Sequence, residues 1–344
     1  MTPPPLKTPA PPQGIVAALA AGFETVNARL ELILLPLALD LLLWLGPHVS
    51  IQHLIPPITD GLQAMLTQAG PVDPTATANL KLIVTALQDF GARFNVLSFL
   101  STAPLGLPSL IAGRQPAAVP GGAPLIWYVD SVPQYLLLFG VFTLLGLFLG
   151  ALYFGGIAQQ VRDRRVRWLL LLRQVWGDWA RLTALGALAL VVIAVLGLPV
   201  FFLSWLIGLF SPVIGAVISV IGLSVLLWVL FYGGFALHGM FVHRRGLFAA
   251  VWDSIRLVQI NLPPAAGLFM LIMVLNLGLA LVWNAPADGS WLLLLGLAGH
   301  ALISTALITA TFVFYQDRLR WWIEMRQSLQ ARADAEQRGL NRKA

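Results

Sequence analysis

The sequence predicts an all-α polytopic membrane protein with six transmembrane helices. Of its 344 residues, 58% are hydrophobic and only 10% are charged, and the mean hydropathy is +0.82. Soluble domains carry about 25% charged residues, so this chain cannot cover its surface with polar groups. Most of its surface must therefore face lipid, and we expect a multi-pass protein of the cytoplasmic (inner) membrane.

Six apolar segments are long enough to cross a bilayer, for which about 20 residues are needed. Only the first is interrupted by a charge, at Asp40. The residues after this first segment do not resemble a signal-peptide cleavage site, so we interpret it as retained. The six predicted spans are 30–47, 132–157, 183–206, 212–242, 262–284 and 291–315.

The distribution of lysine and arginine predicts the orientation of these spans. All but three of the 21 basic residues fall on one side of the predicted topology, the exceptions being Lys81, Arg93 and Arg114. Cytoplasmic loops carry the excess of basic residues, so both termini are predicted to be cytoplasmic. The same excess predicts contact with anionic headgroups, and no basic stripe with interleaved aromatics indicates nucleic-acid binding.

The chain divides into a tail and three units. Residues 1–13 contain six prolines and no apolar period, which is typical of a disordered tail. Each unit then begins with an amphipathic stretch that we expect to lie in the membrane interface, and continues into a helical hairpin. The units are 14–167, 168–246 and 247–326, followed by a charged cytoplasmic tail at 327–344.

Glycine pairs mark the ends of the first two hairpins, in YFGGIAQQVRDRR (153–165) and FYGGFALHGMFVHRR (231–245). Small residues allow helices to approach closely in membranes, so these glycines are predicted to mediate helix packing. The third unit keeps the aromatic and basic residues but lacks the glycines. The predicted packing glycines are Gly146, Gly150, Gly155, Gly156, Gly233 and Gly234.

This layout resembles a broad group of bacterial six-span inner-membrane proteins, which includes the membrane domain attached to some glycerophosphodiester phosphodiesterases. The resemblance covers about 14–326 and is architectural. It implies a membrane domain of three hairpins. The catalytic barrel of those enzymes is absent from this sequence, so the resemblance implies no phosphodiesterase activity here.

The sequence predicts a polar layer inside the bilayer. At a rise of about 1.5 Å per residue, Asp40, Asn276 and His300 each lie about 10–13 Å from the outer end of their spans. Ser304 follows on the same helical face as His300. A carboxylate at such depth costs at least about 2.5–3.5 kcal/mol and needs a partner, for which His300 is the natural candidate.

Three interpretations of Asp40 are open from the sequence. It could form a structural polar clamp with His300, it could belong to a proton- or ion-linked site, or it could reach the outer headgroups. An interior without a water path would favour the clamp, and a cavity reaching Asp40 would favour transport.

An insertion of residues 48–131 separates the two spans of the first unit. It is predicted to contain a shorter helix over 52–69 and a longer one from about 80 to 99, which pack on the spans and cap the bundle. Two helices and a loop are too small for a core of their own. The insertion is the predicted place for a protein partner.

The sequence contains no recognisable catalytic, metal or cofactor motif. Cysteine is absent, and His48 and His53 lack a neighbouring acidic ligand, so we interpret both as interfacial residues. His238 is predicted to reach the inner interface. We therefore expect a non-enzymatic scaffold, accessory subunit or lipid-contacting factor, and the alternative is a small transporter using the polar layer.

Overall fold

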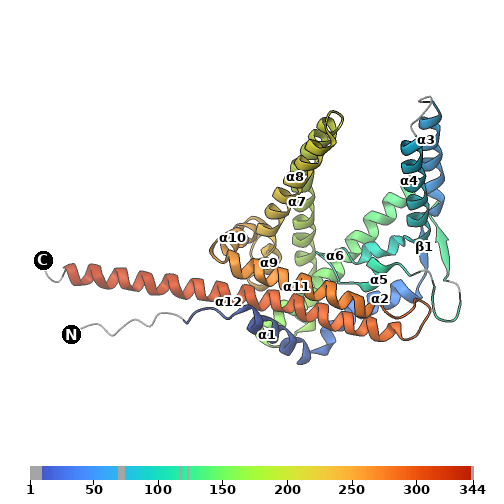
Figure 1. Ribbon diagram of the computed structural model, residues 1–344. Coiled ribbons are helices and arrows are strands. Elements are labelled where there is room, and N and C mark those ends of the chain that lie inside the picture. The colour runs from blue at the N-terminus through green and yellow to red at the C-terminus, as the bar shows by residue number, and fades with distance from the viewer. Residues whose placement is uncertain (1–9, 69–73, 117, 123, 342–344) are drawn as a thin grey trace.

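The computed structural model describes residues 10–68, 74–116, 118–122 and 124–341, and it is predominantly helical (Figure 1). Within these residues, five helical segments are long and apolar enough to cross a membrane, which confirms a multi-pass membrane protein. They are Val132–Asp163 (α6), Trp168–Gly208 (α7), Pro212–Val242 (α8 and α9), Leu262–Trp283 (α11) and Leu293–Ala331, which belongs to α12 (Leu293–Asn341).

The predicted first span is not one helix. Residues Leu30–Ile33 form a 3-10 turn (η1), and Leu34–Leu45 form α2, which has 12 residues. At about 1.5 Å per residue α2 is about 18 Å long, short of the roughly 30 Å of a bilayer core. Five of the six predicted spans therefore correspond to helices long enough to cross a membrane, and the first predicted span does not.

The N-terminal helix α1 (Ile15–Asn27) runs antiparallel to α12. Near its start, the backbone N–H of Gln13 donates to Asp317 at 2.8 Å. Further along, a Cβ on Gly22 would lie 2.6 Å from the carbonyl oxygen of Ala306. We predicted that this stretch lies in the interface, and that position stays a prediction; the structure shows that its apolar face packs along α12.

The amphipathic stretches of the other two units differ from each other. The third forms a separate helix, α10 (Leu247–Ile260), before α11, as the sequence predicts. The second is continuous with its span in the 41-residue α7, so the prediction of a separate helix is wrong there. The proline inside α7 is Pro199, which lies within the predicted span. No proline therefore interrupts the helix between the amphipathic stretch and the span.

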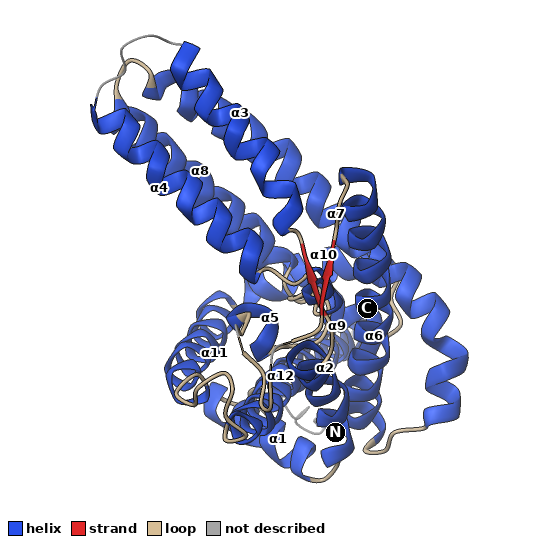
Figure 2. Ribbon diagram, turned by 90° about the vertical axis from the view of Figure 1, so that its right-hand side faces the viewer, coloured by secondary structure: helices blue, strands red, loops and turns tan. Residues whose placement is uncertain are grey.

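Two helical hairpins project from the rest of the molecule (Figure 1). One is α7 with α8 (Pro212–Gly233), whose side chains are largely exposed beyond the mutual contact. The other is α3 (Ile55–Gln68) with α4 (Pro74–Arg93), which also stands clear in Figure 2. The expectation that both insertion helices pack on the spans is therefore wrong for this hairpin.

The remainder of the insertion does pack on the bundle. It comprises η2 (Gln52–Leu54), η3 (Val96–Leu100), α5 (Leu110–Arg114) and a parallel pair of short strands, β1 (His48–Ser50) and β2 (Ile126–Tyr128). Leu107 and Ile111 are almost fully buried and join the same hydrophobic core as Trp44 of α2. The insertion therefore contributes to the core at one end of the bundle.

Candidate functional site around Asp40

Asp40 is fully buried in the middle of α2. The helix is otherwise apolar, and its buried side chains Leu39, Leu43 and Trp44 face the core. Because a buried carboxylate is stable only when hydrogen-bonded or paired, the partners of Asp40 define the site.

The insertion supplies three hydrogen bonds to the carboxylate. The Ser109 hydroxyl donates to Oδ1 at 2.5 Å, and the backbone N–H groups of Leu110 and Ile111 donate at 3.1 Å each. These donors form the first turn of α5, where backbone N–H groups lack partners within the helix. Ser109 also caps α5, since its hydroxyl accepts from Ala112 N–H at 3.0 Å.

His300 approaches the same carboxylate from α12 but is not hydrogen-bonded to it. Its Nδ1 lies 3.8 Å from Asp40 Oδ2 and is buried without a hydrogen-bond partner among the described residues. A separation of 3.8 Å exceeds hydrogen-bond length, so the contact is at most an ion pair with a protonated imidazole.

The other two members of the predicted layer lie elsewhere. Ser304 is buried on α12, one turn from His300. Asn276 is exposed on α11, and therefore does not face the buried carboxylate. The structure brings together Asp40 and His300, whereas Asn276 does not bridge them.

A second set of bonds ties the insertion and α2 to the loop between α11 and α12. The guanidinium of Arg114 pairs with Asp288 at 2.7 Å and donates to the Pro286 carbonyl. Trp44 Nε1 donates to the Asp288 carbonyl at 3.0 Å, and its ring meets Trp291 edge-on at 5.9 Å. Both ends of the chain's membrane part are therefore joined to the insertion.

Asn95 fixes the start of the insertion against its middle. Its Oδ1 accepts from Val49 N–H at 3.0 Å and Leu97 N–H at 3.1 Å, and its Nδ2 donates to the Pro47 carbonyl at 3.4 Å. A single amide side chain thus satisfies three backbone groups where α2 gives way to β1.

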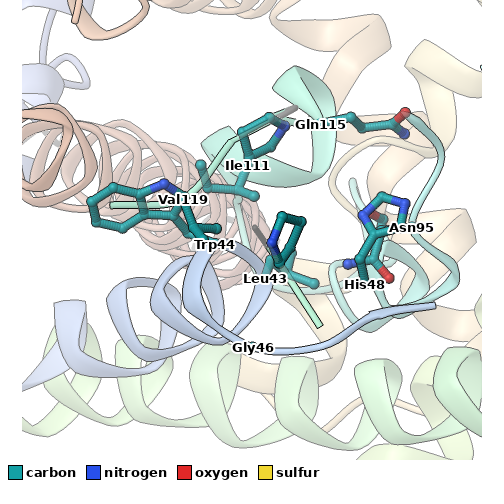
Figure 3. Close-up of a pocket in the computed structure, with 11 residues that line it drawn as sticks. Leu43, Trp44, Gly46, His48, Asn95, Ile111, Gln115 and Val119 are labelled. Carbon is teal, nitrogen blue, oxygen red and sulfur yellow. The ribbon is translucent and has the colours of Figure 1, made fainter. Parts of the chain in front are cut away.

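A shallow hollow lies next to this junction (Figure 3). Leu43 and Trp44 of α2 face Ile111 of α5 across it, and His48 and Asn95 lie to one side. Burial lowers the pKa of His48 below its ordinary value, and its Nε2 is buried without a hydrogen-bond partner among the described residues. The residues that line this hollow do not include Asp40.

The predicted packing glycines make different kinds of contact. A Cβ on Gly146 or Gly150 would lie 2.6 Å from the Leu100 carbonyl or 2.7 Å from the Leu105 carbonyl, so α6 approaches the backbone of the insertion and not another spanning helix. Gly155 and Gly156 would meet side chains, Leu171 at 2.9 Å and Leu32 at 3.3 Å.

The second pair does not pack in the same way. A Cβ on Gly233 would have no atom within 4 Å. A Cβ on Gly234 would lie 3.1 Å from the backbone carbonyl oxygen of Phe231, in the preceding turn of the same helix. They mark the break between α8 and α9 (Ala236–Val242).

His238 on α9 is buried, and its Nε2 lies 2.7 Å from the Thr311 hydroxyl of α12. The prediction that it reaches the interface is therefore wrong. Nearby, the Tyr153 hydroxyl donates to Thr305 at 3.0 Å, which links α6 to the same helix. These polar contacts lie within the bundle and form part of its packing.

Sequence reasoning missed Ser109, Arg114 and Asp288 as partners. Ser109 precedes a helix of only five residues, which has no detectable period. Arg114 carried a weak signal, as one of only three basic residues on its side of the predicted topology. Within the described parts of the chain, no group of three His, Cys, Asp or Glu residues is placed to hold a metal ion.

No protein-family model, curated protein or solved structure matches this chain.

Proposed function

We propose that this chain is a non-enzymatic integral protein of the cytoplasmic membrane whose insertion is a fixed platform. The observation that carries the proposal is that the Asp40 carboxylate accepts hydrogen bonds from three donors of the insertion. A carboxylate satisfied in this way acts as an anchor, since its hydrogen-bonding capacity is directed at the protein's own backbone. This supports the clamp interpretation with Ser109 and α5 as the main partners.

The anchored platform leaves the α3–α4 hairpin available to a partner. Four large apolar side chains on it are between 49% and 70% exposed: Ile58, Leu82, Ile83 and Phe90. Exposed apolar patches of this kind mark protein or membrane contacts. A role as scaffold or accessory subunit, with a protein partner on this hairpin, fits this arrangement. We also propose that the side of the protein that carries most of the lysines and arginines contacts anionic headgroups.

We infer that α1 and α2 together make the sixth crossing. The pair starts with Gln13 beside Asp317 and ends with Trp44 beside Trp291. It therefore extends along α12 from Asp317 to its start at Leu293, 24 residues or about 36 Å, which exceeds a bilayer core. This arrangement supports cytoplasmic positions for both termini.

A small transporter is the second candidate. It is favoured by the buried, unpartnered Nδ1 of His300 at 3.8 Å from Asp40, because neighbouring titratable groups inside a membrane mark proton pathways. The resemblance to the membrane domain of phosphodiesterases also remains a proposal and implies no activity.

Proton flux and unfolding measured on the same variant separate the two candidates. For an anchor, Asp40→Asn lowers the unfolding midpoint in detergent, while proteoliposomes of the unaltered protein show no proton flux above empty vesicles. For a transporter, the unaltered protein conducts protons, and Asp40→Asn abolishes that flux with little change in stability. Asp60→Asn, an exposed acid on α3, is the matched control. Proton flux that depends on Asp40 would refute the anchor proposal.

A further inference from the structure

A small hollow lies between α10 and α12, beside Arg318 and Trp322 and so at least 18 residues along α12 from His300, the neighbour of Asp40. Its lining combines the last turns of α10 with the part of α12 where arginines replace apolar residues. Its polar lining residues are Asp253, Arg256, Asn261, Arg318 and Trp322.

Arg318 is the most constrained of these groups. It is only 7% exposed, and its guanidinium lies 4.7 Å from the centre of the Phe314 ring. One terminal nitrogen donates to the Gln13 carbonyl at 2.9 Å, but the buried Nε has no hydrogen-bond partner among the described residues. A buried cationic donor without an acceptor is unfavourable, so the geometry calls for an acceptor from outside the described chain.

The charge of the lining favours an anion. Asp253 is the acidic residue of the hollow, and it already pairs with Arg245 at 3.3 Å. Arg256 is exposed and lies over the Trp252 ring at 5.1 Å, with no carboxylate within ion-pair distance in the described ranges. Neither guanidinium of the lining therefore has an ion-pair partner among the described residues, and both remain for a ligand.

We propose that this hollow binds the phosphate group of an anionic phospholipid. Guanidiniums match phosphate oxygens in a bidentate geometry, which a point charge does not. A lipid is favoured over free phosphate because Trp252 and Ile260 beside the hollow are 55% and 54% exposed, and offer apolar surface to an acyl chain. Tryptophans at such a level are typical of the membrane interface. The inference gives a defined site to the proposed headgroup contact and rests on it.

Native mass spectrometry of the delipidated full chain in a neutral detergent tests the site. We expect one phosphatidylglycerol to bind about tenfold more tightly than phosphatidylcholine, which corresponds to about 1.4 kcal/mol. Arg256→Gln with Arg318→Gln should remove that preference. Arg165→Gln with Arg173→Gln is the control, since it removes the same charge from exposed arginines outside the hollow.

The outcomes distinguish the site from general attraction. Equal loss in both double variants would overturn the site while leaving the headgroup contact, and no preference in any protein would overturn both. Complete displacement of phosphatidylglycerol by millimolar inorganic phosphate would assign the hollow to free phosphate and refute the lipid. If the Arg318 variant fails to fold, Arg256→Gln alone carries the test, because that side chain is exposed. Unchanged binding in this variant would also refute the proposal.

Discussion

Asp40 stabilises the fold by completing the first turn of α5, a helix that belongs to a distant part of the sequence. The carboxylate is a charged acceptor for Ser109 O–H and two backbone N–H groups, and hydrogen bonds to charged groups contribute about 1.5–3 kcal/mol each. Negative charge at a helix N-terminus adds a favourable interaction with the helix dipole. This side chain is therefore one of the contacts that hold the insertion against the bundle, together with the Arg114–Asp288 pair.

Double-variant analysis should find that Asp40 is coupled to Ser109 and hardly to His300. Ser109→Ala is expected to lower the free energy of unfolding by about 1–3 kcal/mol, because it removes a hydrogen bond to a buried carboxylate. The double variant Ser109→Ala with Asp40→Asn should lower the free energy of unfolding by less than the sum of the two single effects, since both substitutions affect the same Ser109–Asp40 hydrogen bond. His300→Ala with Asp40→Asn should be additive within about 0.5 kcal/mol. Stronger coupling to His300 in unfolding measurements would contradict the hydrogen-bond pattern.

His48 should make the stability of the protein depend on pH. Burial lowers its pKa below 6.5, so the unfolded chain takes up this proton at a higher pH than the folded one. The stability is therefore complete above about pH 6.5 and is lost as the pH falls towards the folded pKa. His48→Asn should reduce the drop in unfolding midpoint between about pH 7.5 and 5.5, whereas His53→Asn, at an exposed position, should retain it. An unchanged drop in the His48 variant would show that other groups cause it.

At the scale of elements, α6 holds the insertion through close backbone contact at two glycines, beside the contacts of Phe99 with Tyr135 and Phe139. The carbonyl oxygens of Leu100 and Leu105 lie 2.6 and 2.7 Å from the Cβ positions of Gly146 and Gly150, so the end of η3 and the loop after it rest directly on the helix backbone. The Gly-x-x-x-Gly pattern predicts a close approach, but its spacing does not say whether the partner is a helix or a loop.

Alanine at Gly146 should loosen this contact. Its Cβ would lie 2.6 Å from a carbonyl oxygen, so Gly146→Ala is expected to cost about 1–3 kcal/mol through overpacking. Gly140→Ala on the same helix is the matched control, because nothing lies within 4 Å of its Cβ position. That control should be neutral or gain up to about 1 kcal/mol from helix propensity. Equal unfolding midpoints for the two variants would mean that the insertion does not rest on α6.

The elements that the sequence predicts well are those with a long apolar period. α6, α7, α8, α11 and α12 follow from hydropathy, and α10 follows from its amphipathic spacing. The strands β1 and β2 have three residues each and pair across the insertion, so they carry no local signal. The depth argument brought Asp40 and His300 together. The depth argument could not identify Ser109, because hydropathy does not show that a loop folds back into the bundle.

At the scale of the whole molecule, the predicted first span does not form one long helix, and the proposed first crossing is made by α1 and α2 together. The chain leaves the helical path at residues 28 and 29 and continues through η1 into α2, so α1 and α2 pack separately along α12. The sequence concealed this arrangement because α1 has the amphipathic pattern of an interfacial helix. Its apolar face is covered by α12, where Gly22 allows close contact with Ala306 and Ala310.

Cysteine labelling tests whether this broken pair crosses the membrane. The chain has no cysteine, so single substitutions at exposed positions report without background. We expect Pro11→Cys and Gln330→Cys to react with an impermeant maleimide only from the cytoplasmic side, because the basic residues gather there. Ala78→Cys on α4 should react only from the opposite side. If the cysteines at 11 and 78 react from the same face, α1 and α2 do not cross, five helices span, and the two termini lie on opposite faces. The orientation would then have to be assigned again, because an odd number of crossings cannot keep both basic termini in the cytoplasm.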